Sequence, residues 1–159
     1  MAAFISRELL NRILDAAQVS PDREVCGLLL GQGDSVTAIL PAANVAADPA
    51  CRFEIDPVVL IGAHRLARGS EGCGLAVLGH YHSHPSGDVA PSACDAEMAH
   101  ADGALWLICD AGRGYGLWRS TGEGLHGRFG AVPLVVGEGP EQQGGGASSS
   151  QSFLASPMS

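Results

Sequence analysis

The spacing of apolar residues in the first 40 positions predicts one helix followed by a β-hairpin. Ser6 is a favourable N-cap, and the apolar positions after it recur at the spacing of one helix face. These positions are Leu9, Leu10, Ile13, Leu14 and Ala17. The run EVCGLLLG (24–31) is continuous and apolar, which is typical of a strand buried on both faces. VTAIL (36–40) follows a Gly-Asp turn and is predicted to be its hairpin partner.

The rest of the pattern alternates short apolar runs with helix starts. Asp56 and Pro57 fit the N-cap and first turn of a helix that continues to residue 69. A short helix is expected to begin near Ser92. The predicted strands are 53–55, 75–82, 104–110, 115–120 and a weaker one at 128–136. This order predicts an α/β class of fold, in which a mixed sheet is combined with helices.

Length and composition predict one folded domain with a tail. A chain of 159 residues with 46% hydrophobic composition can bury one core. Residues 1–136 are therefore expected to form a single domain. Residues 137–159 are rich in Gly, Ser and Gln without apolar periodicity, so they are expected to form a flexible C-terminal tail.

Charge, hydropathy and cysteine usage narrow the possible partners and the expected cellular environment. The net charge is −8 and the arginines are scattered, so a nucleic-acid partner is not expected. No run approaches the ~20 apolar residues of a membrane span, and the start of the chain does not resemble a signal peptide, so we expect a cytoplasmic protein without a membrane partner. The five cysteines are odd in number and lack a C-x-x-C pair, which favours reduced, buried thiols. The oligomeric state stays open.

The stretch HYHSHPSGDVAPSACD (80–95) carries the candidate chemistry. His82 and His84 lie two apart at the end of a predicted strand, so their side chains leave one face with Cα atoms ~6–7 Å apart. Pro85 ends that strand, and the return of the chain can bring Asp95 back to the pair. Two histidines and a carboxylate leave a fourth position of tetrahedral zinc open to water, as in catalytic sites.

Other interpretations of the same residues compete with the metal site. Ser92 and Asp95 fit a capping box, in which each side chain satisfies the other's backbone amide. Paired histidines in loops are also commonly solvated. His80 shares the face of the two histidines but lies farther from the turn, and Tyr81 points the other way and is expected in the core.

Four segments together resemble the JAMM (MPN-plus) metalloprotease family, in its small stand-alone prokaryotic form. They are EVCGLLLG, NVAADPACRFEIDP, GHYHSHP and PSACD, and the similarity extends from about Ile5 to Val136. The resemblance implies a cytidine-deaminase-like JAB/MPN fold of α+β type, with a mixed, mostly antiparallel sheet flanked by about three helices.

The same resemblance implies a mechanism. His82, His84 and Asp95 would bind Zn²⁺, Glu24 would take a proton from the attacking water and pass it to the leaving amine, and Ser92 would stabilise the oxyanion. Asp88 and Glu97 are rival acids that we expect to be solvated.

The resemblance also implies a substrate class. The small relatives act as peptidases or isopeptidases that cut after the C-terminal Gly-Gly of ubiquitin-like or sulfur-carrier proteins. The alternatives are a catalytically silent MPN scaffold, a RadC-like protein, and a phage-tail or cell-wall peptidase. The complete motif disfavours a scaffold, and the acidic charge disfavours a RadC-like role in DNA repair.

Overall fold

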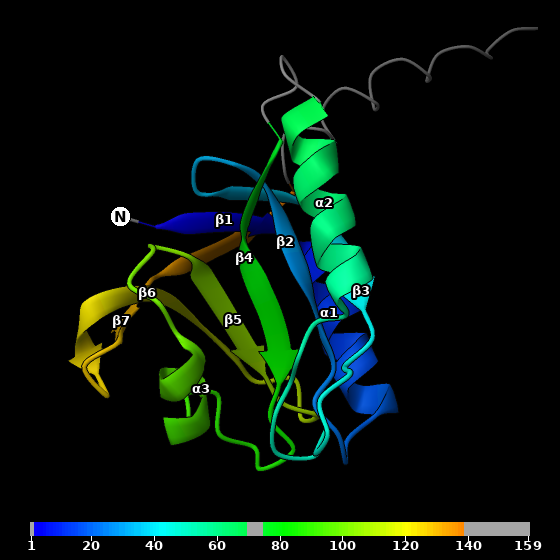
Figure 1. The fold of residues 1–159 in the computed structure, drawn as a ribbon, viewed down its shortest axis with the longest axis vertical. Coiled ribbons are helices and arrows are strands. Elements are labelled where there is room, and N and C mark those ends of the chain that lie inside the picture. Colours follow the sequence, from blue (N-terminus) through cyan, green and yellow to red (C-terminus); the bar gives the residue numbers. More distant parts are fainter. Residues whose placement is uncertain (1, 70–74, 139–159) are drawn as a thin grey trace, which may run out of the picture.

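The computed structural model describes residues 2–69 and 75–138, and within them an eight-stranded mixed sheet carries three helices (Figure 1). The elements are β1 (Ala3–Ser6), α1 (Arg7–Val19), β2 (Cys26–Gln32), β3 (Ser35–Ala42), α2 (Pro57–Gly69), β4 (Ala76–Ser83), α3 (Ala93–Met98), β5 (Leu105–Cys109), β6 (Tyr115–Leu125), β7 (Phe129–Ala131) and β8 (Leu134–Gly137). The strand order is β7-β6-β5-β4-β2-β3-β1-β8. The predicted combination of a mixed sheet with about three helices is confirmed.

Each helix begins where its cap predicts. The Ser6 hydroxyl accepts a hydrogen bond from the Leu9 amide at 3.2 Å, and the Asp56 carboxylate accepts one from the Val58 amide at 3.0 Å. Of the five predicted apolar positions of α1, four are buried and Leu9 packs against the same core at partial exposure. These caps satisfy amides that have no partner inside the helix, which fixes where each helix begins.

The helices cover both faces of the sheet (Figure 1). Leu29 of β2 packs with α1, whereas its neighbours Leu28 and Leu30 pack with Ala63 of α2. Because successive strand side chains point to opposite faces, α1 and α2 lie on opposite sides of the sheet. The short helix α3 packs against the cluster that contains Trp106, near the end of β4.

The histidine motif lies at the end of a central strand. β4 pairs antiparallel with β2, with Cys26 opposite His82, and parallel with β5 on its other side. Tyr81 is 2% exposed and belongs to the core on the α1 side, as expected from strand alternation. The side chains of His82 and His84 consequently leave β4 towards the side of α3.

Three strand predictions are corrected by the structure. β1 was not expected, because it is only four residues long, ends at the Ser6 cap itself and shows no alternation of apolar and polar residues in its first three positions. Residues 53–55 do not form a strand, and Ile55 makes only an isolated bridge with Asn44. The predicted strand at 128–136 is two strands, β7 and β8, which pair with β6 and β1.

The division of that last segment closes the sheet. β7 and β8 lie at opposite edges of the strand order, yet only Val132 and Pro133 separate them. Three Cα steps reach at most ~11 Å, so the sheet must curl until its two edges approach. Pro133 has no amide to donate to a ladder, and its carbonyl accepts from the Ala3 amide at 3.0 Å. Four neighbouring pairs are antiparallel and three are parallel, so the sheet is mostly antiparallel.

The cysteine and tail predictions have mixed outcomes. The described cysteines are free, and Cys26 and Cys109 are buried, but Cys51 is exposed, so the expectation of burial is wrong there. Cys73 and the expected tail at 139–159 lie outside the described residues. β8 ends at Gly137, one residue past the expected end of the domain. None of the helices in the described part of the chain has the length and apolar character of a bilayer span.

Candidate active site

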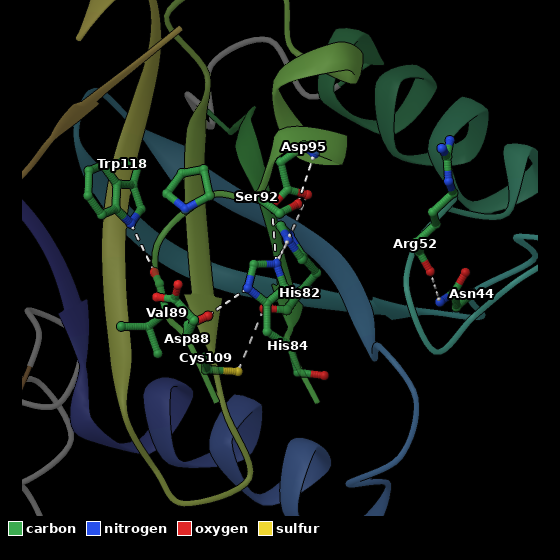
Figure 2. A network of polar contacts seen from close by, with 12 residues as sticks. Asn44, Arg52, His82, His84, Asp88, Val89, Ser92, Asp95, Cys109 and Trp118 are labelled. Atoms are coloured by element: carbon green, nitrogen blue, oxygen red, sulfur yellow. Dashed lines mark hydrogen bonds and ion pairs between the residues drawn. The ribbon is translucent and has the colours of Figure 1, made fainter. Parts of the chain in front are cut away.

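His82, His84 and Asp95 converge on one point beneath α3 (Figure 2). The Nε2 atoms of the two histidines are 3.1 Å apart. The Asp95 carboxylate faces both rings, with Oδ1 3.2 Å from His82 Nε2 and Oδ2 3.1 Å from His84 Nε2. The three residues are between 0 and 6% exposed. The structure therefore brings together the three residues that the sequence predicts as ligands.

The capping box is present and does not compete with this cluster. The Ser92 hydroxyl accepts from the Asp95 amide at 3.1 Å, and Asp95 Oδ2 accepts from the Ser92 amide at 2.8 Å. The same carboxylate reaches the two histidines through both oxygens. The capping box is therefore confirmed, and it is compatible with a ligand role of Asp95, since the cap sets the orientation in which the carboxylate meets the rings.

The loop between His84 and Ser92 orients the His84 ring. His84 Nδ1 donates to the Asp88 carbonyl at 2.6 Å, which fixes the ring so that Nε2 is directed into the cluster. Two side chains hold this loop in place, one on β6 and one in the turn between β6 and β7. Trp118 Nε1 donates to the Val89 carbonyl at 3.1 Å (Figure 2). His126 Nε2 donates to the Pro91 carbonyl at 3.0 Å. Sequence reasoning missed both tethers, because neither has a local signal near the motif.

Glu24 approaches the cluster from the neighbouring strand. The register that places Cys26 opposite His82 brings Glu24, two residues earlier, to the level of His84. One ligand atom from each of Glu24, His82 and His84 lies within 4.8 Å of the others. Glu24 is 4% exposed, and its buried Oε1 atom has no hydrogen-bond partner within residues 2–69 and 75–138. Asp88 and Glu97 are exposed, so Glu24 is the acid that the fold buries beside the histidines.

Burial and pairing shift the protonation equilibria of these groups. Burial raises the pKa of Glu24 to about 7. Burial likewise lowers the pKa of His82. Burial also opposes the charged forms of His84 and Asp95, but hydrogen bonds and nearby charges together outweigh it. Asp95 and the Asp88 carbonyl raise the pKa of His84, and the two histidines with the Ser92 amide lower that of Asp95. The cluster thus combines an ionised carboxylate with ring nitrogens directed at the same point.

The donor set fits a divalent metal ion. Two imidazole nitrogens and a carboxylate oxygen are ligands that zinc accepts, and a hydrogen bond from the far ring nitrogen to a carbonyl, as at His84, is common among metal-binding histidines. The partnerless Glu24 oxygen adds an acceptor at the edge of the cluster. The residues present can therefore hold a metal ion.

His80 lies apart from this point. Its ring packs against Trp106 and Phe53 at centroid distances of 4.2 and 5.0 Å, and Phe53 also stacks on His82 at 4.2 Å. Burial lowers the pKa of His80 to about 3. His80, Phe53 and Trp106 line a cavity of about 530 Å³ with Met98 and Leu60. His80 is therefore part of the wall of a neighbouring cavity, in accord with its greater distance from the turn.

With this geometry established, comparison with known proteins identifies the family. The model of the prokaryotic homologs of the JAB domain matches residues 6–121, and the chain belongs to this family. The expected resemblance to JAB/MPN proteins is confirmed. A solution structure of a Desulfitobacterium hafniense protein superposes with a TM-score of 0.71 at 23% identity, covering 86% of this chain and 94% of that one, and it supports the fold alone.

Two curated relatives have names that describe activities. A desampylase of Haloferax volcanii is 39% identical over 111 residues, which are 69% of this chain and 78% of that protein. A probable TtuB-protein conjugate cleaving protease of Thermus thermophilus is 30% identical over 99 residues, which are 62% of this chain and 64% of that protein.

Proposed function

We propose that this protein is a zinc-dependent metallopeptidase or isopeptidase that cleaves after the C-terminal Gly-Gly of ubiquitin-like or sulfur-carrier proteins. The observation that carries the proposal is the convergence of His82, His84 and Asp95 within 3.2 Å, with the Glu24 carboxylate buried beside them. The names of the two relatives support the same class of reaction.

His82, His84 and Asp95 would hold the zinc ion, and a three-residue set leaves one position open to water. When bound at such a site, zinc lowers the pKa of its water towards neutrality. The Asp88 carbonyl keeps the His84 ring in the tautomer that presents Nε2, and the Ser92 amide holds the Asp95 carboxylate in place. The ligands are therefore oriented by hydrogen bonds outside the cluster.

Glu24 is the proton carrier in this proposal. Its carboxylate accepts the proton that the attacking water loses, and the same proton passes to the leaving amine as the C–N bond breaks. A pKa of about 7, raised by burial, suits a group that must both accept and donate near neutral pH. Because Oε1 has no hydrogen-bond partner among the described residues, it is available to take that proton.

Ser92 stabilises the oxyanion. Its oxygen accepts a hydrogen bond from the Asp95 amide, so the hydroxyl proton is not used by the cap and can be donated to the developing negative charge. Ser92 is not a nucleophile, because water attacks the carbonyl. The capping box thus holds both Ser92 and Asp95 at the reacting centre.

The preference for Gly-Gly follows from close approach. An extended segment without side chains can bring its carbonyl nearer to a buried centre than one with Cβ atoms can. The Thermus thermophilus relative is named a probable TtuB-protein conjugate cleaving protease, which supports conjugates as a second kind of substrate. We therefore propose both extended carriers and conjugates as substrates.

The test compares metal-stripped protein with protein restored by zinc or by magnesium. The substrate is a small ubiquitin-like protein with a short extension after its Gly-Gly. Zinc should restore cleavage and magnesium should not, because imidazole ligands suit zinc and magnesium requires an oxygen octahedron. Equal cleavage by stripped and zinc-restored protein would overturn the proposal.

A further inference from the structure

The backbone around Glu24 is held mainly by hydrogen bonds outside the regular ladder, several of them from side chains. β2 begins at Cys26, so Glu24 and Val25 precede the strand that was predicted to contain them. The Glu24 amide donates to the Pro49 carbonyl at 2.7 Å. The Glu24 carbonyl accepts from Asn44 Nδ2 at 2.8 Å. A carboxylate that must face a metal site is thus carried by a segment that the sheet alone does not hold.

Ser83 replaces one bond of the ladder at this point. The Ser83 amide donates to the Val25 carbonyl at 3.0 Å, as expected for a paired position. The returning bond of such a pair would join the Val25 amide to the Ser83 carbonyl, but the Val25 amide donates instead to Ser83 Oγ at 2.8 Å. The same hydroxyl donates to the Arg23 carbonyl at 3.5 Å. One side chain therefore contacts the backbone on both sides of Glu24.

Ser83 is well placed to transmit this restraint. It lies between His82 and His84 on β4, and strand alternation directs its side chain away from the face of the two rings. It is 3% exposed, so water does not substitute easily for its hydroxyl. Within the part of the chain that the structure describes, Ser83 forms no hydrogen bond with the Glu24 carboxylate or with the ring nitrogens of the two histidines.

We propose that Ser83 is a positioning residue, which ties the segment bearing Glu24 to the strand bearing the two histidines and so fixes the distance between the proton carrier and the metal ligands. The inference rests on the proposed function of the same site. A displacement of about 1 Å at a reacting group can cost ~10²-fold in rate, so loss of this tie should reduce turnover without removing a reacting group. Asn44 donates a hydrogen bond to the Glu24 carbonyl and so restrains the same segment.

The test compares Ser83→Ala with Ser120→Ala in the full zinc-loaded chain. Ser120, on β6, is a matched control that lies away from the histidine motif. It is 1% exposed, and its hydroxyl donates to Asp102 Oδ1 at 2.7 Å. Ser83→Ala should lower kcat by about 10- to 100-fold with KM changed less than about twofold. Ser120→Ala should keep kcat near the wild-type value. Zinc content and the electronic spectrum of the cobalt-substituted protein should be unchanged in both variants.

A double variant identifies the residue through which Ser83 acts. If Ser83 acts through Glu24, adding Ser83→Ala to Glu24→Gln should not lower the residual rate further. A wild-type kcat in Ser83→Ala, a loss of zinc in that variant, or an equal fold-loss in the Glu24→Gln background would each overturn the inference. If Ser83→Ala does not fold, Ser83→Cys is compared with Ser120→Cys, and an equal kcat in these two variants would overturn it.

The wild-type protein separates this inference from the proposed function. If zinc-loaded wild type cleaves neither extended carriers nor conjugates, the proposed function fails and the inference fails with it. If wild type is active and Ser83→Ala behaves like Ser120→Ala, the inference fails alone.

Discussion

Ser92 and Asp95 hydrogen-bond each other in both directions, at 3.1 Å from the Asp95 amide to Ser92 Oγ and at 2.8 Å from the Ser92 amide to Asp95 Oδ2. This reciprocal pair starts α3 and at the same time directs the Asp95 carboxylate to His82 and His84. In the proposed mechanism, this helix cap preorganises a metal ligand, Asp95, and an oxyanion donor, Ser92.

The pair predicts that cap and ligand can be separated by mutation. Asp95→Asn keeps an oxygen that can accept from the Ser92 amide but loses the anionic ligand. Loss of a residue that only hydrogen-bonds to a metal ligand costs ~10- to 100-fold in metal affinity, so loss of the ligand itself should lower zinc affinity by more than this. The melting temperature of the metal-free protein should change little. Ser92→Ala should do the opposite, with zinc retained and stability lowered by about 0.5–2 kcal/mol. Metal analysis and calorimetry check both, and wild-type zinc content in Asp95→Asn would refute the ligand assignment.

Glu24 can be tested separately from metal binding. Glu24→Gln preserves size and removes the titrating group, so zinc content should stay at the wild-type value while kcat falls by about 10²–10⁴-fold. Asp88→Asn and Glu97→Gln are controls, because both acids are exposed and should tolerate the change with nearly full activity. Steady-state kinetics of the three variants decide the assignment. Retained activity in Glu24→Gln, or a large loss in either control, would move the proton-transfer role to another group.

The local part of the site could be predicted from the sequence. His82, His84 and Asp95 lie within 14 consecutive residues, and strand alternation with the Ser92 cap is sufficient to bring them together. The position of Glu24 could not be derived in this way. It depends on the antiparallel register of β2 with β4, which joins residues 58 positions apart in the sequence. Only the resemblance to a known family pointed to Glu24 before the structure.

The distinction between local and long-range signals also explains which parts of the fold were predicted wrongly. Helices were predicted well, because Ser6, Asp56 and Ser92 are local caps. Residues 128–136 were predicted to form one strand, because no local signal shows that β7 and β8 lie at opposite edges of a curled sheet. Residues 53–55 have strand-like side chains, but Phe53 is used to pack against His82 and Trp106. Closure of the sheet and loop packing are long-range properties that periodicity does not contain.

Truncation distinguishes the predicted tail from the last strand. Removal of residues 139–159 should leave the melting temperature within about 2 °C and the zinc content unchanged, because this segment lacks apolar periodicity. Removal from Leu134 onward also deletes β8 and exposes the edge of β1, so it should cause a large loss of stability. Differential scanning calorimetry of the two truncated proteins tests the boundary. A large drop for the shorter deletion would mean that the segment docks on the domain.

The central claim is that this zinc site hydrolyses the bond after a Gly-Gly, and mass spectrometry of the products tests it most directly. A ubiquitin-like sulfur carrier with residues beyond its Gly-Gly is incubated with zinc-loaded wild type, with Glu24→Gln as the inactive control. Wild type should yield a carrier whose mass ends at the second glycine. Ala-Ala in place of Gly-Gly should slow cleavage by roughly 10- to 200-fold, since clashes of ~1–3 kcal/mol would arise beside the metal. An intact carrier, or a product cut elsewhere, would contradict the account.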